Sequence, residues 1–388
     1  MYKVIASQNL GLAISMHPER VESLSFPDIS IFLQSPSFQV LEARLTISGE
    51  HFPISYRIPN LDIPLNPHTA EVESQVWTHC QAFNLYEGRE RAVNASKFSY
   101  LPGLTDPTLS LIALKSTVNG FIDLFVHDDD IDEGRTSSTR LKETNRRFVE
   151  VATGRPPTSE DLGKVRGYAQ AIKDFFSSKL SSKNSKLFIE TLNKYLQSTE
   201  EEAADIEENI KARKGGGTHD RVSYTEYIES RRDTSGIFHA IQMIWSAHEL
   251  DAERLISTYL PLEKMYRYAC DSVCRLNDIA SANKECVEFQ ALATKLKIPV
   301  KDVVTSNSVL LKWKEGKDFS TAVNETLEEY EEIIASFMKY AWRLQDDIRT
   351  DPELKIAVNV LFGLVRGHGV WAGLSKRYDL EFTTPVLY

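Results

Sequence analysis

Two dense clusters of acidic and polar residues, about 150 positions apart, constrain this chain more than any other feature. The first runs from His127 to Glu133 and the second from Asn277 to Glu285. Each lies at the end of an apolar segment that has the pattern of a helix. Carboxylates beside apolar sequence are costly unless a counter-charge neutralises them, and oxygen ligands of this kind suit Mg²⁺ or Mn²⁺. The sequence therefore predicts a divalent-metal site.

The bulk properties exclude several classes of protein. The 388 residues are 42% hydrophobic, which is enough for one large domain or two medium ones. Nucleic acid is excluded as a partner because the net charge is −10 and no Lys/Arg stripe runs along the chain. We find no apolar run long enough to span a bilayer and no signal peptide. The four cysteines lack zinc-type spacing, so we expect buried free thiols and a cytoplasmic location.

The pattern along the chain predicts an all-α fold with an N-terminal arm. Residues 1–65 are rich in Pro and Ser with short β-like runs, and we expect an irregular or partly β arm of unclear structure. Residues 66–388 have helical periodicity almost throughout, and we expect them to form one catalytic domain. Segment 214–218 is the clearest loop, because three of its residues are glycine. The expected helical stretches are about 109–126, 138–152, 159–180, 184–210, 222–247, 251–285, 300–311, 320–346 and 352–376.

The second cluster has the sharper spacing. Asn277, Ser281 and Glu285 follow one another at intervals of four, so all three side chains lie on one helix face. An amide oxygen, a hydroxyl and a carboxylate on one face can bind Mg²⁺ and leave positions for phosphate oxygens. Lys284 stands beside them, where its ammonium can also meet phosphate. The alternative is a polar surface face, which we disfavour because Asn and Ser are poor helix formers.

The first cluster leaves two registers open. Asp128 and Asp132 are four positions apart on one helix face, and Asp129 and Glu133 form a second such pair. Carboxylates this close repel one another unless cations intervene. An acidic run is usually a solvated helix end, but this one follows the strongly apolar segment 121–126, which indicates a buried helix.

The two clusters together resemble the signature of class I terpene synthases, in particular the microbial sesquiterpene cyclases. In that family an aspartate-rich motif, DDxxD/E, and a second motif, (N/D)Dxx(S/T)xx(K/R)(E/D), hold three Mg²⁺ ions around a diphosphate. Segment 128–132 matches the first motif. The second and more specific motif is matched at every defined position, by Asn277, Asp278, Ser281, Lys284 and Glu285. The resemblance covers about residues 60–380.

Positions near the C-terminus support the resemblance. Arg377-Tyr378 resembles the pair that closes over the diphosphate in microbial terpene cyclases. Trp371 lies six positions earlier, at a spacing similar to that of the family's last helix. The first motif can be read in two registers, Asp128/Asp129/Asp132 or Asp129/Asp130/Glu133. We prefer the first, because Phe125 then falls three positions before the leading aspartate, as in related microbial enzymes.

A further match lies upstream of the second motif. Arg231 precedes Asn277 at a distance similar to that of the family's diphosphate-sensing arginine. Thr234 and Ser235 then fall where the family breaks a helix to offer a carbonyl to the substrate, and Gly236 suits such a break.

The resemblance implies a bundle around a central apolar cavity that ionises an isoprenyl diphosphate. Farnesyl diphosphate is the first expected substrate, giving a cyclic sesquiterpene and diphosphate, with three Mg²⁺ ions that Mn²⁺ can replace. The implied catalytic residues are Arg231, Lys284, Arg377, Tyr378 and Ser235. The implied metal ligands are Asp128, Asp132, Asn277, Ser281 and Glu285. The implied substrate-binding residues are Phe98, Phe121, Phe125, Thr234 and Trp371, and for each aromatic side chain ordinary core packing is the alternative.

Rival functions stay open at this point. One is a diterpene cyclase that uses geranylgeranyl diphosphate. Another is a chain-elongating prenyltransferase, for which segment 346–351 would have to act as a second aspartate-rich motif, although its spacing is one residue too long and we expect a loop there. A third is a catalytically silent isoprenoid-binding protein. The family also predicts a homodimer, which the sequence itself does not test.

Overall fold

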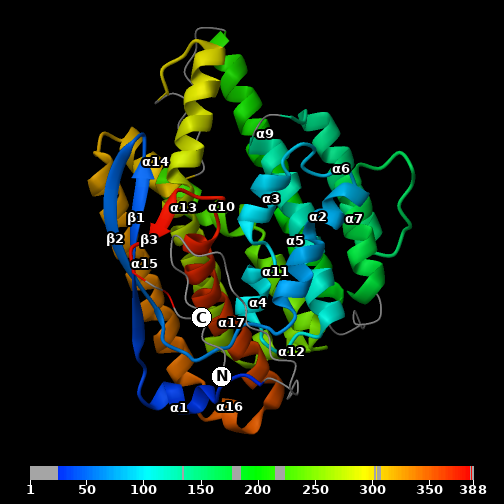
Figure 1. Cartoon of the computed structure of the whole chain (residues 1–388), viewed down its shortest axis with the longest axis vertical. Helices are drawn as coiled ribbons and strands as arrows, with labels where there is room; N and C mark the ends of the chain where they lie inside the picture. Colours follow the sequence, from blue (N-terminus) through cyan, green and yellow to red (C-terminus); the bar gives the residue numbers. More distant parts are fainter. Residues whose placement is uncertain are drawn as a thin grey trace.

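The protein is a helical bundle with one small sheet on its flank (Figure 1). The computed structural model describes residues 25–132, 135–176, 185–214, 223–300, 303, 307–384 and 386. The predicted all-α class and the partly β arm are both confirmed, because two strands precede residue 66. The sheet and α15 lie on one side of the molecule, and α5, α6 and α7 lie on the other (Figure 1).

The elements have the following bounds. Up to the first acidic cluster they are α1 (Ile29–Gln34), β1 (Phe38–Ile47), β2 (Glu50–Pro59), α2 (Thr69–Ala82), α3 (Glu90–Ser96), α4 (Tyr100–Thr105) and α5 (Leu111–Asp132). Up to the second cluster they are α6 (Ser138–Ala152), α7 (Gly163–Ala171), the π-helical turn η1 (Ile172–Phe176), α9 (Ser185–Lys214), α10 (Tyr224–Thr234), α11 (Ile237–Ala247), α12 (Ala252–Thr258) and α13 (Leu260–Leu296). The rest are α14 (Ser308–Lys314), α15 (Phe319–Arg343), α16 (Asp347–Thr350), α17 (Pro352–Leu374) and β3 (Leu380–Phe382).

Polar caps define where several helices begin. The side chain of Ser137 accepts an N–H of α6, and the side chain of Asp318 does the same for α15. Asp351 caps α17, whose first residue is proline. A cap oxygen satisfies backbone donors that have no partner within the helix, and proline costs nothing at the first position. The predicted starts of α6, α15 and α17 therefore lie within one residue of the observed starts.

Other predicted boundaries were wrong in instructive ways. The second acidic cluster does not end a helix but lies inside α13, which continues to Leu296 because a left-handed residue, Lys297, ends it only there. Of the stretch predicted over 300–311, the structure shows α14 from Ser308, where Asn307 caps it, while residues 301, 302 and 304–306 lie outside the described residues. Segment 346–351, predicted as a loop, contains the short helix α16. Strand β3 was not predicted, and residues 215–218 of the predicted loop lie outside the described residues.

Helix α17 occupies the centre of the bundle, between α4, α13 and the sheet (Figure 1). Two of its glycines allow α4 to approach closely, since a Cβ on Gly363 would lie 1.9 Å from the carbonyl oxygen of Thr105 and one on Gly367 would lie 3.0 Å from Leu104. Among the described residues, α17 is the one helix long and apolar enough to cross a membrane, but 89% of its apolar window is buried within the protein. It is thus a core helix by its surroundings.

The four cysteines are buried and free, as the sequence predicted. Cys270 and Cys274 lie within 3.9 Å of each other, sulfur to sulfur, one turn apart on α13. Their thiols donate to the carbonyl oxygens of Arg232 and Arg231, over 3.8 and 3.7 Å, near the end of α10.

We predict that Gly363→Ala destabilises the protein by about 3 kcal/mol, because the new methyl group must displace the backbone of α4. Urea unfolding followed by circular dichroism measures this loss. Glu328→Ala, at an exposed position of α15, serves as the control and should change stability little. Equal stability of the two variants would contradict the tight packing of α4 on α17.

Candidate active site

The structure brings the two acidic clusters into direct contact. Asp129, at the end of α5, is 3% exposed, and Lys284 of α13 reaches it with its ammonium 3.2 Å from Oδ1. Arg377, which follows α17, donates to both carboxylate oxygens over 2.6 and 3.1 Å. The hydroxyl of Tyr86 donates to Oδ2 over 2.7 Å. One buried carboxylate therefore joins three segments that are far apart in the sequence.

The charges around Asp129 decide its ionisation. Burial by itself raises the pKa of a carboxyl group, but the positive charges of Arg377 and Lys284 outweigh it and hold the pKa of Asp129 well below its ordinary value. Burial likewise opposes the charge on Arg377, and Asp129 outweighs it, so that the pKa of Arg377 is raised. Both groups are therefore charged at neutral pH and form a buried ion pair.

The neighbouring aspartates point to different partners. Asp130 accepts from Arg135 over 2.7 Å and from Lys164 of α7 over 2.8 Å, on another side of α5. Asp128 is half-buried. Asp132 ends α5, but its side chain and the whole of Glu133 lie outside the described residues.

The oxygen donors of the second cluster lie on one face of α13, as their spacing predicted. Ser281 donates to Oε1 of Glu285 over 2.5 Å. The amide of Asn307, which caps α14, donates to both side chains over 3.3 and 3.2 Å. Asn277 lies one turn earlier, where its oxygen accepts from Arg231 over 2.9 Å and its amide donates to the hydroxyl of Tyr378 over 2.9 Å.

Asp278, the second residue of the same motif, faces the protein interior. It is 0% exposed and accepts from the hydroxyl of Tyr227 over 2.6 Å, from Arg231 over 3.1 Å and from the backbone N–H of Ser308 over 3.0 Å. A buried carboxylate with this many donors has a structural role, because its hydrogen bonds hold the donor segments in place. Asp278 thus fixes Arg231 and the start of α14 against α13.

The predicted helix break lies between α10 and α11. Gly236 has φ +67°, a conformation that other residues adopt at a cost, and the ring of Tyr195 packs against it. Ser235 accepts the N–H of Ile237 with its hydroxyl, over 3.2 Å, and donates to the carbonyl of Arg232. Thr234 lies at the last position of α10. The break therefore sits one turn after Arg231, as expected from the sequence.

Three of the four predicted aromatic residues form one cluster beneath the ion pair. The ring of Phe125 lies 5.3 Å from that of Phe98 and 6.2 Å from that of Trp371, centroid to centroid. The guanidinium of Arg377 stacks over Phe125 at 5.0 Å. Trp371 also lies 5.7 Å from the ring of Tyr378, and its indole N–H donates to the carbonyl of Ser96 over 3.0 Å. The cluster thus fixes the segment that carries Arg377.

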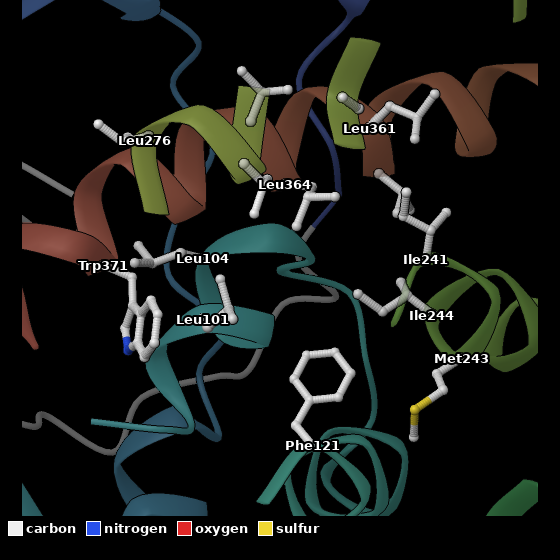
Figure 2. Close-up of a cluster of buried hydrophobic side chains, with 14 of the residues drawn as sticks. Leu101, Leu104, Phe121, Ile241, Met243, Ile244, Leu276, Leu361, Leu364 and Trp371 are labelled. Atoms are coloured by element: carbon white, nitrogen blue, oxygen red, sulfur yellow. The ribbon is translucent and has the colours of Figure 1, made fainter. Parts of the chain in front are cut away.

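Apolar side chains from α4, α5, α11, α13 and α17 point toward one another next to this cluster (Figure 2). Phe121 lies one turn before Phe125 and faces Met243 and its neighbours on α11 (Figure 2). The labelled set consists of Leu101, Leu104, Phe121, Ile241, Met243, Ile244, Leu276, Leu361, Leu364 and Trp371 (Figure 2).

One imidazole lies on the same side of α17. His368 is 3% exposed, lies four positions after Leu364 on α17, and has its ring 6.0 Å from that of Trp371, centroid to centroid. Burial, assisted by the charge of Arg231, lowers the pKa of His368 to about 3. The imidazole is therefore neutral at physiological pH and adds no positive charge to this apolar region.

The donor set fits a hard divalent cation. In the described parts of the chain no three His, Cys, Asp or Glu side chains converge on a single point, so no site made only of these side chains is preformed there. The donors on α13 are instead an amide, a hydroxyl and a carboxylate oxygen, and they face the end of α5 across the Lys284–Asp129 contact. Oxygen donors of mixed charge that leave positions open suit Mg²⁺ shared with a phosphate ligand.

Sequence reasoning missed several residues of the site. Three residues that hydrogen-bond to motif residues are Tyr86, Tyr227 and Asn307. No catalytic or metal-binding motif occurs in the segments where they lie. Asn307 could have been recognised as a helix cap, but its second role depends on where α14 packs. The partner of Asp129 was also not predicted, because spacing along one helix says nothing about the residue opposite it.

Comparison with known proteins now identifies the family. The family described as "Terpene synthase family 2, C-terminal metal binding" matches residues 121–336, which is more than half of the chain. The chain belongs to the terpene synthase family. The resemblance inferred from the two motifs is confirmed, and the protein is an enzyme of the terpene cyclase type.

Characterised relatives of this terpene synthase are distant but cover most of both chains. A sesquiterpene synthase of Piloderma croceum is 26% identical over 82% of this chain and 86% of its own. The Delta(6)-protoilludene synthase of Stereum hirsutum is 23% identical over 81% of this chain and 79% of its own.

Solved structures agree with the fold of this terpene synthase. A crystal structure of a-eudesmol synthase has a TM-score of 0.61 at 18% identity and covers 81% of this chain and 97% of its own. The linalool/nerolidol synthase of Streptomyces clavuligerus, crystallised with 2-fluorogeranyl diphosphate, has a TM-score of 0.62 at 16% identity over 82% and 100%. Likeness at this identity shows a shared fold.

We predict that Asp278→Asn lowers the free energy of unfolding by about 3 kcal/mol, because it removes the buried counter-charge of Arg231. Chemical denaturation at neutral pH measures the change. Asp346→Asn is the matched control, since that carboxylate pairs with Arg349 while its side chain is 82% exposed. A loss no larger than that of the control would contradict the anchoring role of Asp278.

Proposed function

We propose that this terpene synthase ionises farnesyl diphosphate and cyclises the resulting cation to a sesquiterpene, releasing diphosphate. The observation that carries the proposal is the contact of Arg377 and Lys284 with Asp129, which joins both motifs at one edge of the apolar group. A diphosphate needs cations and an isoprenoid chain needs apolar walls, and here the two lie side by side.

Four side chains would bind the diphosphate. Arg377, Lys284 and Arg231 supply positive charge, and the hydroxyl of Tyr378 lies within 2.9 Å of the amide of Asn277, on the same side of the site. Donors fixed in advance stabilise the charge that develops as the carbon–oxygen bond breaks. The break after Thr234 would let Ser235 and its backbone approach the departing oxygen.

The metal ligands of the proposal are Asp128 and Asp132 on α5, with Asn277, Ser281 and Glu285 on α13. We propose the register that begins at Asp128, in which Asp129 pairs with Arg377 rather than with a metal ion. Three Mg²⁺ ions bound there, or Mn²⁺ in their place, would neutralise charge on the diphosphate.

The aromatic cluster would guide the cation after ionisation. Phe98, Phe121, Phe125 and Trp371 present ring faces or edges near the apolar group, and a cation over such a ring gains about 1–2 kcal/mol in a dry site. The neutral imidazole of His368 avoids repulsion with the migrating charge. Burial of Tyr378 and Trp371 supports a site from which water is excluded, which protects the cation from quenching.

The rival functions have less support. Diterpene cyclisation, from geranylgeranyl diphosphate, uses the same chemistry and differs only in the length of the apolar region. A prenyltransferase would need segment 346–351 to face the first motif. In the structure Asp351 instead caps α17 and pairs with Arg254. A catalytically silent binding protein would not need charged groups held so closely around Asp129.

We propose that residues 66–388 form the catalytic domain and that residues 1–65 form an N-terminal arm that precedes it. We propose that the enzyme works in the cytoplasm and forms a homodimer, as related enzymes often do.

The function is tested by incubating the protein with Mg²⁺ and geranyl, farnesyl or geranylgeranyl diphosphate in turn. We expect diphosphate release, fastest with farnesyl diphosphate, and cyclic products detected by gas chromatography with mass spectrometry. Chelation of the metal with EDTA should abolish release. Absence of diphosphate with every substrate would refute the enzymatic proposal, and faster turnover of geranylgeranyl diphosphate would favour the diterpene alternative.

The metal register is tested by single substitutions. Asp128→Asn and Asn277→Ala should each lower turnover by about 100-fold or more while the circular dichroism spectrum is unchanged. Asp130→Asn is the matched control on the same helix end, and it should retain most activity because its carboxylate faces Arg135 and Lys164. Loss of turnover in Asp130→Asn with normal turnover in Asp128→Asn would establish the shifted register.

A further inference from the structure

The N-terminal hairpin and the C-terminal strand form one sheet, in the order β2-β1-β3. Leu45 pairs with Leu380 and Ala43 pairs with Phe382, although more than 330 positions separate them. Strand β3 begins two residues after Tyr378. The hairpin is therefore the structure that holds the chain immediately beyond Arg377 and Tyr378.

The turn of the hairpin rests on the second metal motif. The backbone N–H of Ser48 donates to the side-chain oxygen of Asn283 over 2.8 Å. The amide of Asn283 donates to the carboxylate of Asp379 over 2.6 Å, and the backbone N–H of Thr46 donates to the carbonyl of Asp379 over 3.0 Å. Asn283 directly precedes Lys284, and Asp379 directly follows Tyr378. One side chain thus ties the hairpin, α13 and the C-terminal segment together.

Buried contacts fix the rest of the sheet to α17. The hydroxyl of Tyr56 donates to the carbonyl of Gly369 over 2.8 Å in the protein interior. The ring of Phe382 occupies the space beside Gly373, where a Cβ would approach it to 2.4 Å. Glycine at these two positions allows the sheet to lie directly on the helix. The sheet is therefore a rigid support.

The support matters because of where α17 ends. Beyond Leu374 the chain leaves the helix, and Arg377 and Tyr378 project from a short connection. Ordering one residue of such a segment costs about 1–2 kcal/mol of conformational entropy, a cost that binding must otherwise offset. Strand pairing on one side and the cap-like contacts of Ser375 on the other fix this connection in advance.

We propose that the N-terminal hairpin is a positioning element of the active site, acting through Asn283 and strand β3 to hold Arg377 and Tyr378 opposite Lys284. The proposal rests on the diphosphate chemistry proposed above. It gives the hairpin, which lies within residues 1–65 and outside both metal motifs, a role in the active site. The hairpin itself would not contact the substrate. It would set the distance between Lys284 and the pair Arg377 and Tyr378, which would.

A second carboxylate introduced at the Asn283–Asp379 contact tests this role. Asn283→Asp keeps the acceptor for Ser48 but places two carboxylates against each other, which should push the C-terminal segment away from α13. We expect the dissociation constant of pyrophosphate, measured by calorimetry with Mg²⁺ present, to rise about fivefold. We also expect a larger share of water-quenched alcohols among the products. The melting temperature should stay close to that of the wild type, because the contact is exposed.

The double variant Asn283→Asp with Asp379→Asn restores a donor and an acceptor in reversed order. It should bring both the pyrophosphate affinity and the alcohol fraction back to within about twofold of the wild-type values. Asn60→Asp, at the far end of the same hairpin, is the matched control for an added charge. Hydrogen exchange should be faster in residues 376–384 of Asn283→Asp alone.

The outcomes separate the two proposals. If the wild type neither binds pyrophosphate with Mg²⁺ nor releases it from any substrate, the proposed function is at fault. If the wild type does both and Asn283→Asp matches it in affinity and products, the positioning role of the hairpin is wrong. If the double variant does not recover affinity and products, the positioning role of the hairpin is also wrong, because the restored contact between positions 283 and 379 would then not be what holds Arg377 and Tyr378.

Discussion

The neutralisation of one buried carboxylate, Asp129, organises the candidate active site of this terpene synthase. Its partners come from α13, from the end of α17 and from the loop after α2. Because a buried charge without a partner is far more costly than a paired one, these segments are held together by a strong constraint. The same contact places the cations where a diphosphate would lie and orders the aromatic cluster beneath them.

The central position of α17 serves this arrangement. Its glycines admit α4 on one side and the sheet on another, so the helix is buried along most of its length. This packing fixes the position of its C-terminal end relative to α5 and α13. The apolar face with Leu361, Leu364 and Trp371 then continues directly into the charged segment with Arg377 (Figure 2). Under the proposed function, one helix would connect the wall for the hydrocarbon chain to the site for its leaving group.

Sequence-based predictions were accurate where the stabilising interactions act between residues close together in the chain. Spacing of four residues placed Asn277, Ser281 and Glu285 on one face of α13, and capping residues located the starts of α6, α15 and α17, because these effects act within a few residues. The end of α13 and the existence of β3 were not foreseen. A three-residue strand has no pattern of its own and exists only because β1 offers it a partner.

The sequence by itself determined the family and the helical class and named the candidate oxygen donors, since two motifs with fixed internal spacing carry that information within a few residues. Only the tertiary structure decided which aspartate of Asp128, Asp129 and Asp130 faces Arg377, and that the N-terminal hairpin lies against Asn283 and Asp379. The physical reason is that adjacent helical residues point about 100° apart, and the partner at each direction depends on how distant segments pack.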